Sequence, residues 1–113
     1  MMYMIEAIIR PEKLQEAKGV LDDAGFHGLT VTKVRGRGRQ KGIKLQWRAG
    51  EYSVDLIEKI KLEIVVKADE VDRVVDLICG AVGTDNVGDG KIFIHELSDV
   101  VRIRTKEHGI KAI

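Results

Sequence analysis

The stretch Ile60-Lys-Leu-Glu-Ile-Val-Val66 decides the fold, because an apolar side chain stands at every second position. The charged residues Lys61 and Glu63 lie between these apolar positions, and such alternation is typical of a strand that is buried on one face. The stretch therefore predicts a sheet strand whose even-numbered side chains face a core.

Downstream of this strand, residues 71–82 predict an amphipathic helix. Asp69 and Glu70 precede it, where the helix dipole favours acidic side chains. Apolar residues recur along one stripe at helical spacing: Val71, Val74, Val75, Ile78, Cys79 and Val82. Because Cys79 lies on this stripe, we expect it to be a small buried core residue. Lys91-Ile-Phe-Ile-His95 then predicts a further strand.

Upstream, the same order of elements occurs once before. Strands are predicted over residues 3–9 and 29–35. Between them, apolar residues at helical spacing predict a helix that begins near Pro11 and ends at Gly25: Leu14, Ala17, Leu21 and Ala24.

Two consecutive β-α-β units predict an α+β fold of the ferredoxin-like split β-α-β (βαββαβ) class, formed by residues 1–113 as a single domain. A four-stranded antiparallel sheet would carry both helices on one face. The other face would be uncovered, with candidates that are too apolar for open water: Met4 or Ile5, Thr30, Thr32, and Ile92 or Phe93. We therefore expect a homo-oligomer that buries this face.

Charge and cysteine content exclude several classes of protein. The chain of 113 residues has 19 Lys and Arg against 18 Asp and Glu, a formal net charge of +1. No global field favours nucleic acid or an anionic membrane, so we expect no nucleic-acid partner and no direct lipid binding. Cys79 is the single cysteine, which precludes an intramolecular disulfide. No signal peptide or membrane-spanning run is evident, and a cytoplasmic protein is expected.

A polar insertion at residues 36–58 separates the two units, and cations outnumber acids from Arg35 to Lys59. A small domain retains such a long polar loop mainly when the loop has a function. Its first part, Gly36-Arg-Gly-Arg-Gln-Lys-Gly42, has glycines that suit either a ligand-wrapping loop or a flexible loop base, and the second is the commoner case.

Two further segments suit a phosphate chain. Thr84-Asp-Asn-Val-Gly-Asp-Gly-Lys91 combines a lysine with glycines, which let backbone N–H groups approach an anion closely. Taken alone, it is equally consistent with a β-turn and a solvated lysine. In Val101-Arg-Ile-Arg104, strand periodicity would send Arg102 and Arg104 to the same side, where two guanidinium groups can bind one polyanion.

Several motifs occur in order along the chain: Gly36-x-Gly-Arg-Gln-Lys-Gly42, Glu51-Tyr52, Lys59-x-Lys-x-Glu-Ile-Val-Val66, Gly88-Asp-Gly-Lys-Ile-Phe93 and Arg102-Ile-Arg-Thr105. Their order and spacing resemble the PII signal-transduction family of nitrogen regulators over nearly the whole chain. The resemblance implies a homotrimer with a T-loop at about residues 37–55, a B-loop at about 83–91 and a C-terminal segment at about 100–113. It also implies clefts between subunits that bind ATP or ADP, with 2-oxoglutarate joining Mg²⁺ and ATP.

The resemblance assigns the nucleotide-binding roles residue by residue. The phosphates would be held by the B-loop and by the C-terminal segment of a neighbouring subunit: Gly88, Asp89, Gly90, Lys91, Arg102 and Arg104. Thr30 and Val65 occupy positions that resemble those around the adenine.

The 2-oxoglutarate site is implied by the same resemblance. Gln40 corresponds to the side chain that ligates Mg²⁺, and Lys59 corresponds to the lysine that pairs with the distal carboxylate. Gly38, Arg39 and Lys41 would line this site.

Target binding is implied for the T-loop residues Trp47, Arg48 and Tyr52. An ammonium transporter is the expected target, with glutamine synthetase and nitrogenase as other candidates, and such a transporter would recruit the protein to the inner membrane face. Tyr52 matches the position that is uridylylated in some bacterial members. Two departures, Asp85-Asn86 for a usual Gly-Lys and Lys106 for a glycine, imply weaker or differently tuned nucleotide binding.

Two other functions fit the same topology. An RNA-recognition domain would stack bases on aromatic side chains of the open sheet face, but the chain has only two phenylalanines and places Lys61 and Glu63 there. A small phosphate-ester or acyl-phosphate hydrolase would hold a phosphoryl group with arginines and glycine-rich loops, but no base stands near a nucleophile. We therefore expect a protein that is not an enzyme, with the hydrolase as the alternative.

Overall fold

The computed structural model describes residues 1–37, 43–47, 50–54 and 56–113, and it describes side chains for 1–37 and 56–113. The strands and α-helices, in chain order, are β1 (Met2–Ile9), α1 (Leu14–Asp23), β2 (Thr30–Gly36), β3 (Ile43–Trp47), β4 (Gly50–Val54), β5 (Ile57–Lys67), α2 (Val71–Val82) and β6 (Gly90–Leu97). Short 3₁₀ turns are η1 (Pro11–Lys13), η2 (Ala68–Glu70) and η3 (Gly109–Ala112).

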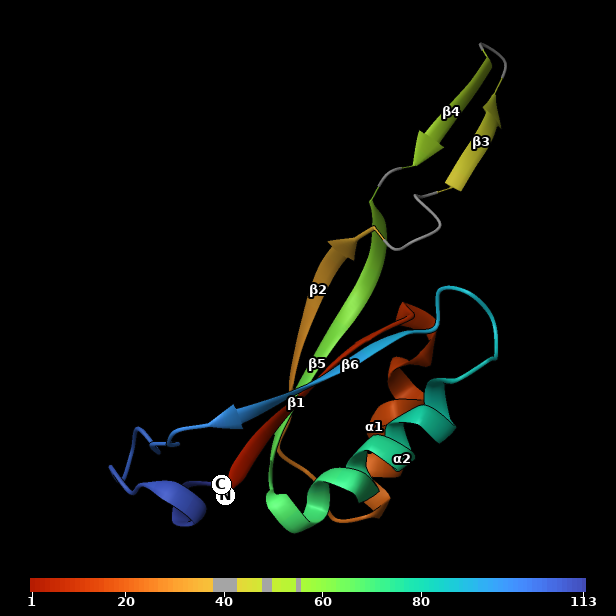
Figure 1. Cartoon of the computed structure of the whole chain (residues 1–113). Coiled ribbons are helices and arrows are strands. Elements are labelled where there is room, and N and C mark those ends of the chain that lie inside the picture. Colours follow the sequence, from red (N-terminus) through yellow and green to blue (C-terminus); the bar gives the residue numbers. More distant parts are fainter. Residues whose placement is uncertain (38–42, 48–49, 55) are drawn as a thin grey trace.

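The four-stranded sheet has the order β2-β5-β1-β6, and each neighbouring pair is antiparallel. Both helices lie on one face of this sheet (Figure 1). The predicted split β-α-β fold is therefore confirmed. The strand that begins the second β-α-β unit is longer than the predicted residues 60–66, because β5 runs from Ile57 to Lys67.

The core lies between the sheet and the two helices. Alternate positions of β1 and β5 face it, and so do positions of α1 and α2 at helical spacing: Ile5, Ala7, Ile9, Ala17, Leu21, Ile60, Leu62, Ile64, Val66, Val74, Ile78 and Val82. Cys79 does not join them and is exposed, so the expectation of a buried cysteine is wrong. The side chains of residues 78 and 79 point about 100° apart around the helix axis, and Ile78 is the one that faces the core.

The insertion contains a hairpin that was not predicted from the sequence. Strands β3 and β4 pair antiparallel, with Ile43 opposite Val54 and Trp47 opposite Gly50. Figure 1 shows this hairpin projecting beyond the end of β2 and β5. Six of the predicted site positions lie outside the described side chains: Gly38, Arg39, Gln40, Lys41, Arg48 and Tyr52. The same holds for the side chain of Trp47, whose backbone ends β3.

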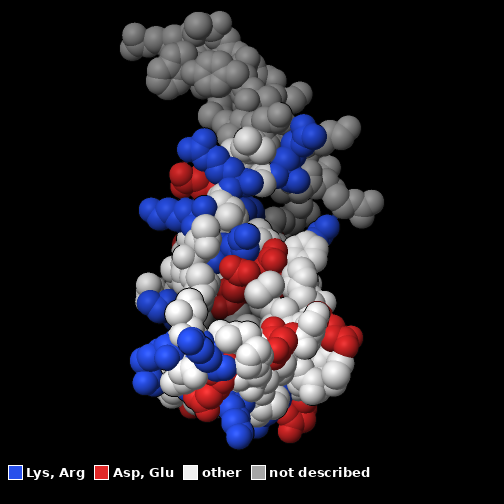
Figure 2. Space-filling view, turned by 90° about the vertical axis from the view of Figure 1, so that its left-hand side faces the viewer, with Lys and Arg blue, Asp and Glu red and all other residues white. Residues whose placement is uncertain are grey.

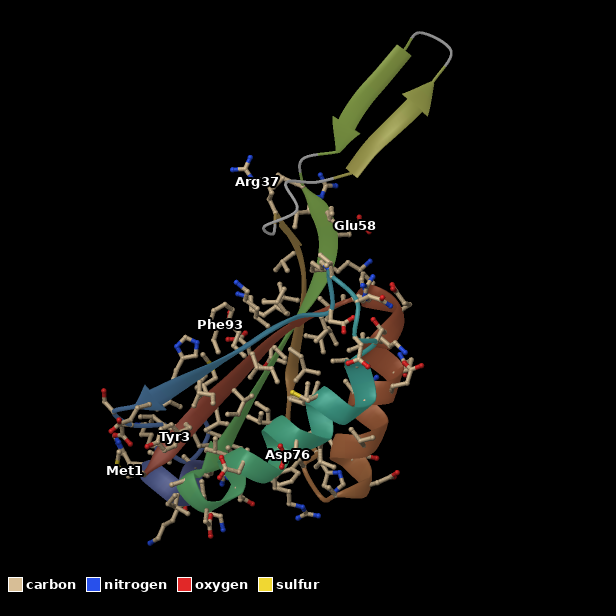
Figure 3. The ribbon with its side chains drawn as sticks, turned by 45° about the vertical axis from the view of Figure 1, so that its right-hand side comes forward. Met1, Tyr3, Arg37, Glu58, Asp76 and Phe93 are labelled. Atoms are coloured by element: carbon tan, nitrogen blue, oxygen red, sulfur yellow. The ribbon has the colours of Figure 1, made fainter. Side chains whose placement is uncertain are left out.

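The sheet face opposite the helices is mixed in character. Residues that pair across antiparallel strands share a face, and the register places Thr30, Glu63, Glu6 and Phe93 in one row. Thr32, Lys61, Ile8 and Lys91 form the next row. Met4 and Phe93, and not Ile5 and Ile92, therefore belong to this face, and Figure 3 shows Phe93 pointing away from the helices. The face is less apolar than expected.

Candidate functional site

A pocket of about 390 Å³ lies at the end of the sheet from which the hairpin projects. We call it the hairpin-end pocket. It is lined by Ile8, Gly36, Arg37, Ile57, Lys59, Val87, Gly88, Gly90, Lys91 and Phe93. Figure 2 shows that Lys and Arg side chains gather beneath the undescribed residues at this end. The pocket thus combines cationic side chains with the backbone of the loop that precedes β6.

This glycine-rich loop (residues 83–91) is organised by a carboxylate that points into it. Asp89 accepts a hydrogen bond from the backbone N–H of Thr84 at 2.7 Å, and it also accepts the Thr84 hydroxyl. These bonds, with a smaller contribution from Arg10, lower the pKa of Asp89 from 3.8 to about 2. Asp89 is therefore ionised at neutral pH, and its carboxylate binds the loop itself.

Two cations hold successive carbonyl groups of the loop. Arg10, which follows β1, donates from Nη2 to the Val87 oxygen at 2.7 Å and from Nε to Asp89 Oδ1 at 3.3 Å. Lys59 donates from Nζ to the Gly88 oxygen at 2.6 Å. Strands β1 and β5 thus fix the loop from two sides.

Two glycines of the loop have backbone conformations that other residues rarely adopt. Gly88 has a φ of +98° and Gly90 a φ of +107°. A Cβ atom at Gly90 would lie 1.7 Å from the carbonyl oxygen of Ile8, so only glycine fits there. The loop therefore enters β6 directly against the backbone of β1, and it leaves peptide groups uncovered by side chains where an anion could approach.

A second, larger pocket of about 840 Å³ lies at the opposite end of the sheet. We call it the tail-end pocket. Its lining includes the predicted adenine positions Thr30 and Val65 together with three residues of the chain's end, Ile110, Ala112 and Ile113. It also includes Gly28, Glu63 and Val100.

The C-terminal clasp (residues 99–109) borders this pocket and differs from the predicted strand. Val101 makes an isolated bridge with His108, and the Lys106 N–H donates to the Arg102 oxygen at 2.8 Å. The chain therefore turns at Arg102, so strand periodicity does not decide where its side chains point. Arg102 Nη1 lies 3.2 Å from Glu107 Oε1, and Arg104 is exposed.

Asp99 fixes the base of the clasp. It accepts hydrogen bonds from the N–H groups of Val100 at 2.8 Å and Gly109 at 3.1 Å, and its Oδ2 lies 2.7 Å from His108 Nδ1. The hydrogen bond with His108 is the main reason that the pKa of Asp99 is lowered. The clasp is thus a second loop organised by one carboxylate.

The predicted ligand residues fall into two groups. Lys59, Gly88, Gly90 and Lys91 meet at the hairpin-end pocket, while Thr30 and Val65 line the tail-end pocket. Lys59 and Val65 are six positions apart on β5, which corresponds to about 20 Å at 3.3 Å per residue. One subunit therefore does not bring the predicted phosphate and adenine positions together.

Two residues of the glycine-rich loop's support were not predicted from the sequence. Arg10 lies 77 positions from Val87, and Thr84 was read only as part of a turn. The local pattern around Arg10 holds no signal for this contact, because it depends on β1 ending beside the start of β6.

Metal and membrane features complete the description. Among the described residues, no group of three or more His, Cys, Asp or Glu side chains is arranged to hold a metal ion. None of the helices formed by those residues has the length and apolar character needed to cross a membrane.

Comparison with known proteins gives a consistent result along the whole chain. A family model described as "Nitrogen regulatory protein P-II" matches residues 2–107. "Nitrogen regulatory protein P-II 2" of Methanothermobacter thermautotrophicus is 55% identical over 112 residues, covering 99% of this chain and 97% of that protein. "Nitrogen regulatory protein P-II" of Synechocystis sp. is 52% identical, covering 99% and 100%. The crystal structure of Arabidopsis thaliana PII bound to citrate matches with a TM-score of 0.81 and 40% identity, covering 99% and 92%.

Proposed function

The chain belongs to the nitrogen regulatory protein P-II family, and from this premise we propose a homotrimeric signal transducer that binds ATP or ADP, Mg²⁺ and 2-oxoglutarate in clefts between subunits. Its relatives are named as regulatory proteins, so the chain is a signalling protein and not a hydrolase. The output we propose is control of an ammonium transporter through residues 37–55, by a cytoplasmic protein that the transporter recruits to the membrane.

The observation that carries the proposal is the division of the ligand residues between two ends of one subunit. The predicted phosphate positions line the hairpin-end pocket and the predicted adenine positions line the tail-end pocket, so a bound nucleotide would be completed by the first pocket of one subunit beside the second pocket of another. Packing of the mixed sheet face against other copies would supply this arrangement. The Lys91 side chain in the first pocket suits the phosphates, and the apolar side chains of Val65 and Ile110 in the second pocket suit the base.

A mixed-trimer experiment tests the shared cleft. Lys91→Ala damages one half of each cleft, and the double variant Arg102→Ala, Arg104→Ala damages the other half. Each alone should lose ATP affinity, with about 1.5–3 kcal/mol for each charge-assisted contact removed. After co-expression, every trimer that contains both kinds of subunit has one junction with two intact halves, so calorimetry should find recovered tight sites. If calorimetry finds no recovered tight sites, or if light scattering gives the mass of a monomer, the shared cleft is refuted.

We extend the proposal to 2-oxoglutarate through Gln40 and Lys59. A dicarboxylate beside a triphosphate is repelled unless a cation lies between them, so binding should require both ATP and Mg²⁺. Titration of 2-oxoglutarate into the ATP-loaded protein should give no heat once EDTA is present. Equal binding without the metal would contradict this arrangement.

The transporter target is tested by Arg48→Ala. This change should abolish binding to an ammonium channel and leave trimer mass and ATP affinity intact, because the family resemblance assigns Arg48 to target binding and not to the nucleotide site. If 2-oxoglutarate restrains the loop base, channel binding should fall as 2-oxoglutarate rises. Channel binding that is retained in the variant would redirect the search to glutamine synthetase or nitrogenase.

A further inference from the structure

Arg10 links two segments that are remote in the sequence. It is the residue after β1 and stands directly before Pro11, yet its guanidinium reaches the glycine-rich loop. One donor, Nη2, contacts the Val87 oxygen at 2.7 Å, and another, Nε, contacts Asp89 Oδ1 at 3.3 Å. Only 27% of the Arg10 side chain and 24% of the Asp89 side chain are exposed, so solvent weakens these contacts less than at an open surface.

The contact with the Val87 oxygen determines how the peptide group between Val87 and Gly88 is oriented. In a trans peptide the carbonyl and the following N–H point in opposite directions. Because Arg10 holds the Val87 oxygen, the Gly88 N–H must point away from the guanidinium. Gly88 itself lines the hairpin-end pocket, and its positive φ of +98° keeps the backbone there free of a side chain.

The second contact supports the first. Asp89 is already bound to Thr84, so the Arg10 guanidinium is anchored to a carboxylate that the loop itself holds, while it also binds the Val87 carbonyl. A planar guanidinium can donate in two directions at once, whereas a lysine ammonium of the same charge cannot reproduce this geometry. Gly88 also lies close enough that a Cβ there would be 3.2 Å from Arg10 Nη2.

We propose that Arg10 is a positioning residue for anion binding by the glycine-rich loop, acting by turning the Gly88 N–H toward the phosphate of a nucleotide. This inference rests on the proposed nucleotide function and adds to it a residue that acts through the loop. Two other roles compete with it. Arg10 could act only as a positive charge near the anion, or it could only stabilise the fold.

The three roles differ in the ADP affinities that they predict for Arg10→Lys and Arg10→Met. We use ADP as the probe, in the absence of Mg²⁺ and 2-oxoglutarate, with Arg10→Lys, Arg10→Met and the control Lys18→Met, which removes a cation from the exposed side of α1. A positioning role predicts that both Arg10 variants weaken ADP binding about tenfold, as expected for the loss of one charge-assisted hydrogen bond, while the control is unchanged. A role as a charge predicts that Arg10→Lys keeps wild-type affinity while Arg10→Met loses it, and a purely structural role predicts that both variants keep it once they are folded.

A ligand-free measurement completes the test. In the folded protein without ADP, amide NMR should show changed resonances for Gly88 and its neighbours in Arg10→Lys, and unchanged ones in Lys18→Met. Wild-type affinity in Arg10→Lys, or unchanged loop resonances there, would overturn the positioning role. If Arg10→Met does not fold, Arg10→Lys alone decides. If the wild-type protein binds no ADP, the proposed nucleotide function is refuted as well. That outcome is distinct from a failure of the Arg10 proposal alone, in which the wild type and Arg10→Lys bind ADP equally well.

Discussion

The glycine-rich loop and the C-terminal clasp are built on the same plan at opposite ends of the sheet. Each is organised by one aspartate that accepts backbone N–H groups, Asp89 in the loop and Asp99 in the clasp. Each also contains a residue other than glycine with a positive φ, Asp85 at 62° and Lys106 at 61°. Each borders one of the two pockets.

The two regions differ in what holds them. Asp89 pairs with an arginine, whose charge does not depend on pH, and Gly90 presses against the backbone of β1. Asp99 pairs with His108, whose side chain is 64% exposed, and a Cβ at Gly109 would meet nothing within 4 Å. The loop is therefore fixed by close packing and permanent charge, whereas the clasp is held by polar contacts in solvent.

Matched glycine substitutions give the largest expected contrast. Gly90→Ala should lower the free energy of unfolding by more than about 4 kcal/mol, because its Cβ would overlap the Ile8 oxygen and no side chain can move aside. Gly109→Ala should cost only about 1–2 kcal/mol, the strain of a left-handed conformation without a clash. Urea unfolding at one protein concentration measures both, and equal losses would show that packing does not distinguish the two regions.

Asp85 and Lys106, the two residues other than glycine with a positive φ, are expected to give smaller changes in the free energy of unfolding, of opposite sign, when replaced by glycine. Lys106→Gly removes backbone strain of about 1–2 kcal/mol and adds about 0.5–1 kcal/mol of unfolded-state entropy, so a net gain of about 0.5–1 kcal/mol is expected. Asp85→Gly should gain less than about 0.5 kcal/mol, because aspartate tolerates this conformation better than lysine. Thermal unfolding compares the two variants. A larger gain at Asp85 would place more strain in the glycine-rich loop than in the clasp.

The sequence predicted the sheet, the helices and the glycine-rich loop because each has a local pattern. Alternation in residues 60–66 and helical spacing in residues 71–82 need no knowledge of the rest of the chain. The turn at Arg102 was missed because Val101-Arg-Ile-Arg104 has the period of a strand, while the Arg102–Lys106 and Val101–His108 contacts decide its shape. Arg10 was missed because its partners depend on strand order. The β3–β4 hairpin was missed although Ile43, Leu45 and Trp47 alternate with polar residues.

Amide protection across pH gives the finest test of the contrast between the two regions. The pKa of each aspartate is lowered in the folded chain, so each carboxylate contributes stability above about pH 4 and loses it as the pH falls, down to about pH 2 for Asp89. Protection of the Gly109 N–H, corrected for its intrinsic exchange rate, should therefore fall as the pH is lowered and Asp99 takes up a proton, because Asp99 then no longer accepts this N–H as a carboxylate. Protection of the Thr84 N–H should persist down to about pH 2, where its acceptor Asp89 takes up a proton. In His108→Gln the loss of protection at Gly109 should begin at a higher pH, because the hydrogen bond with His108 is the main reason that the pKa of Asp99 is lowered, while Thr84 is unaffected. If the acid profile at Gly109 is unchanged in this variant, or if Gly109 and Thr84 lose protection together, His108 does not hold the clasp and the two carboxylate-centred loops respond to pH alike.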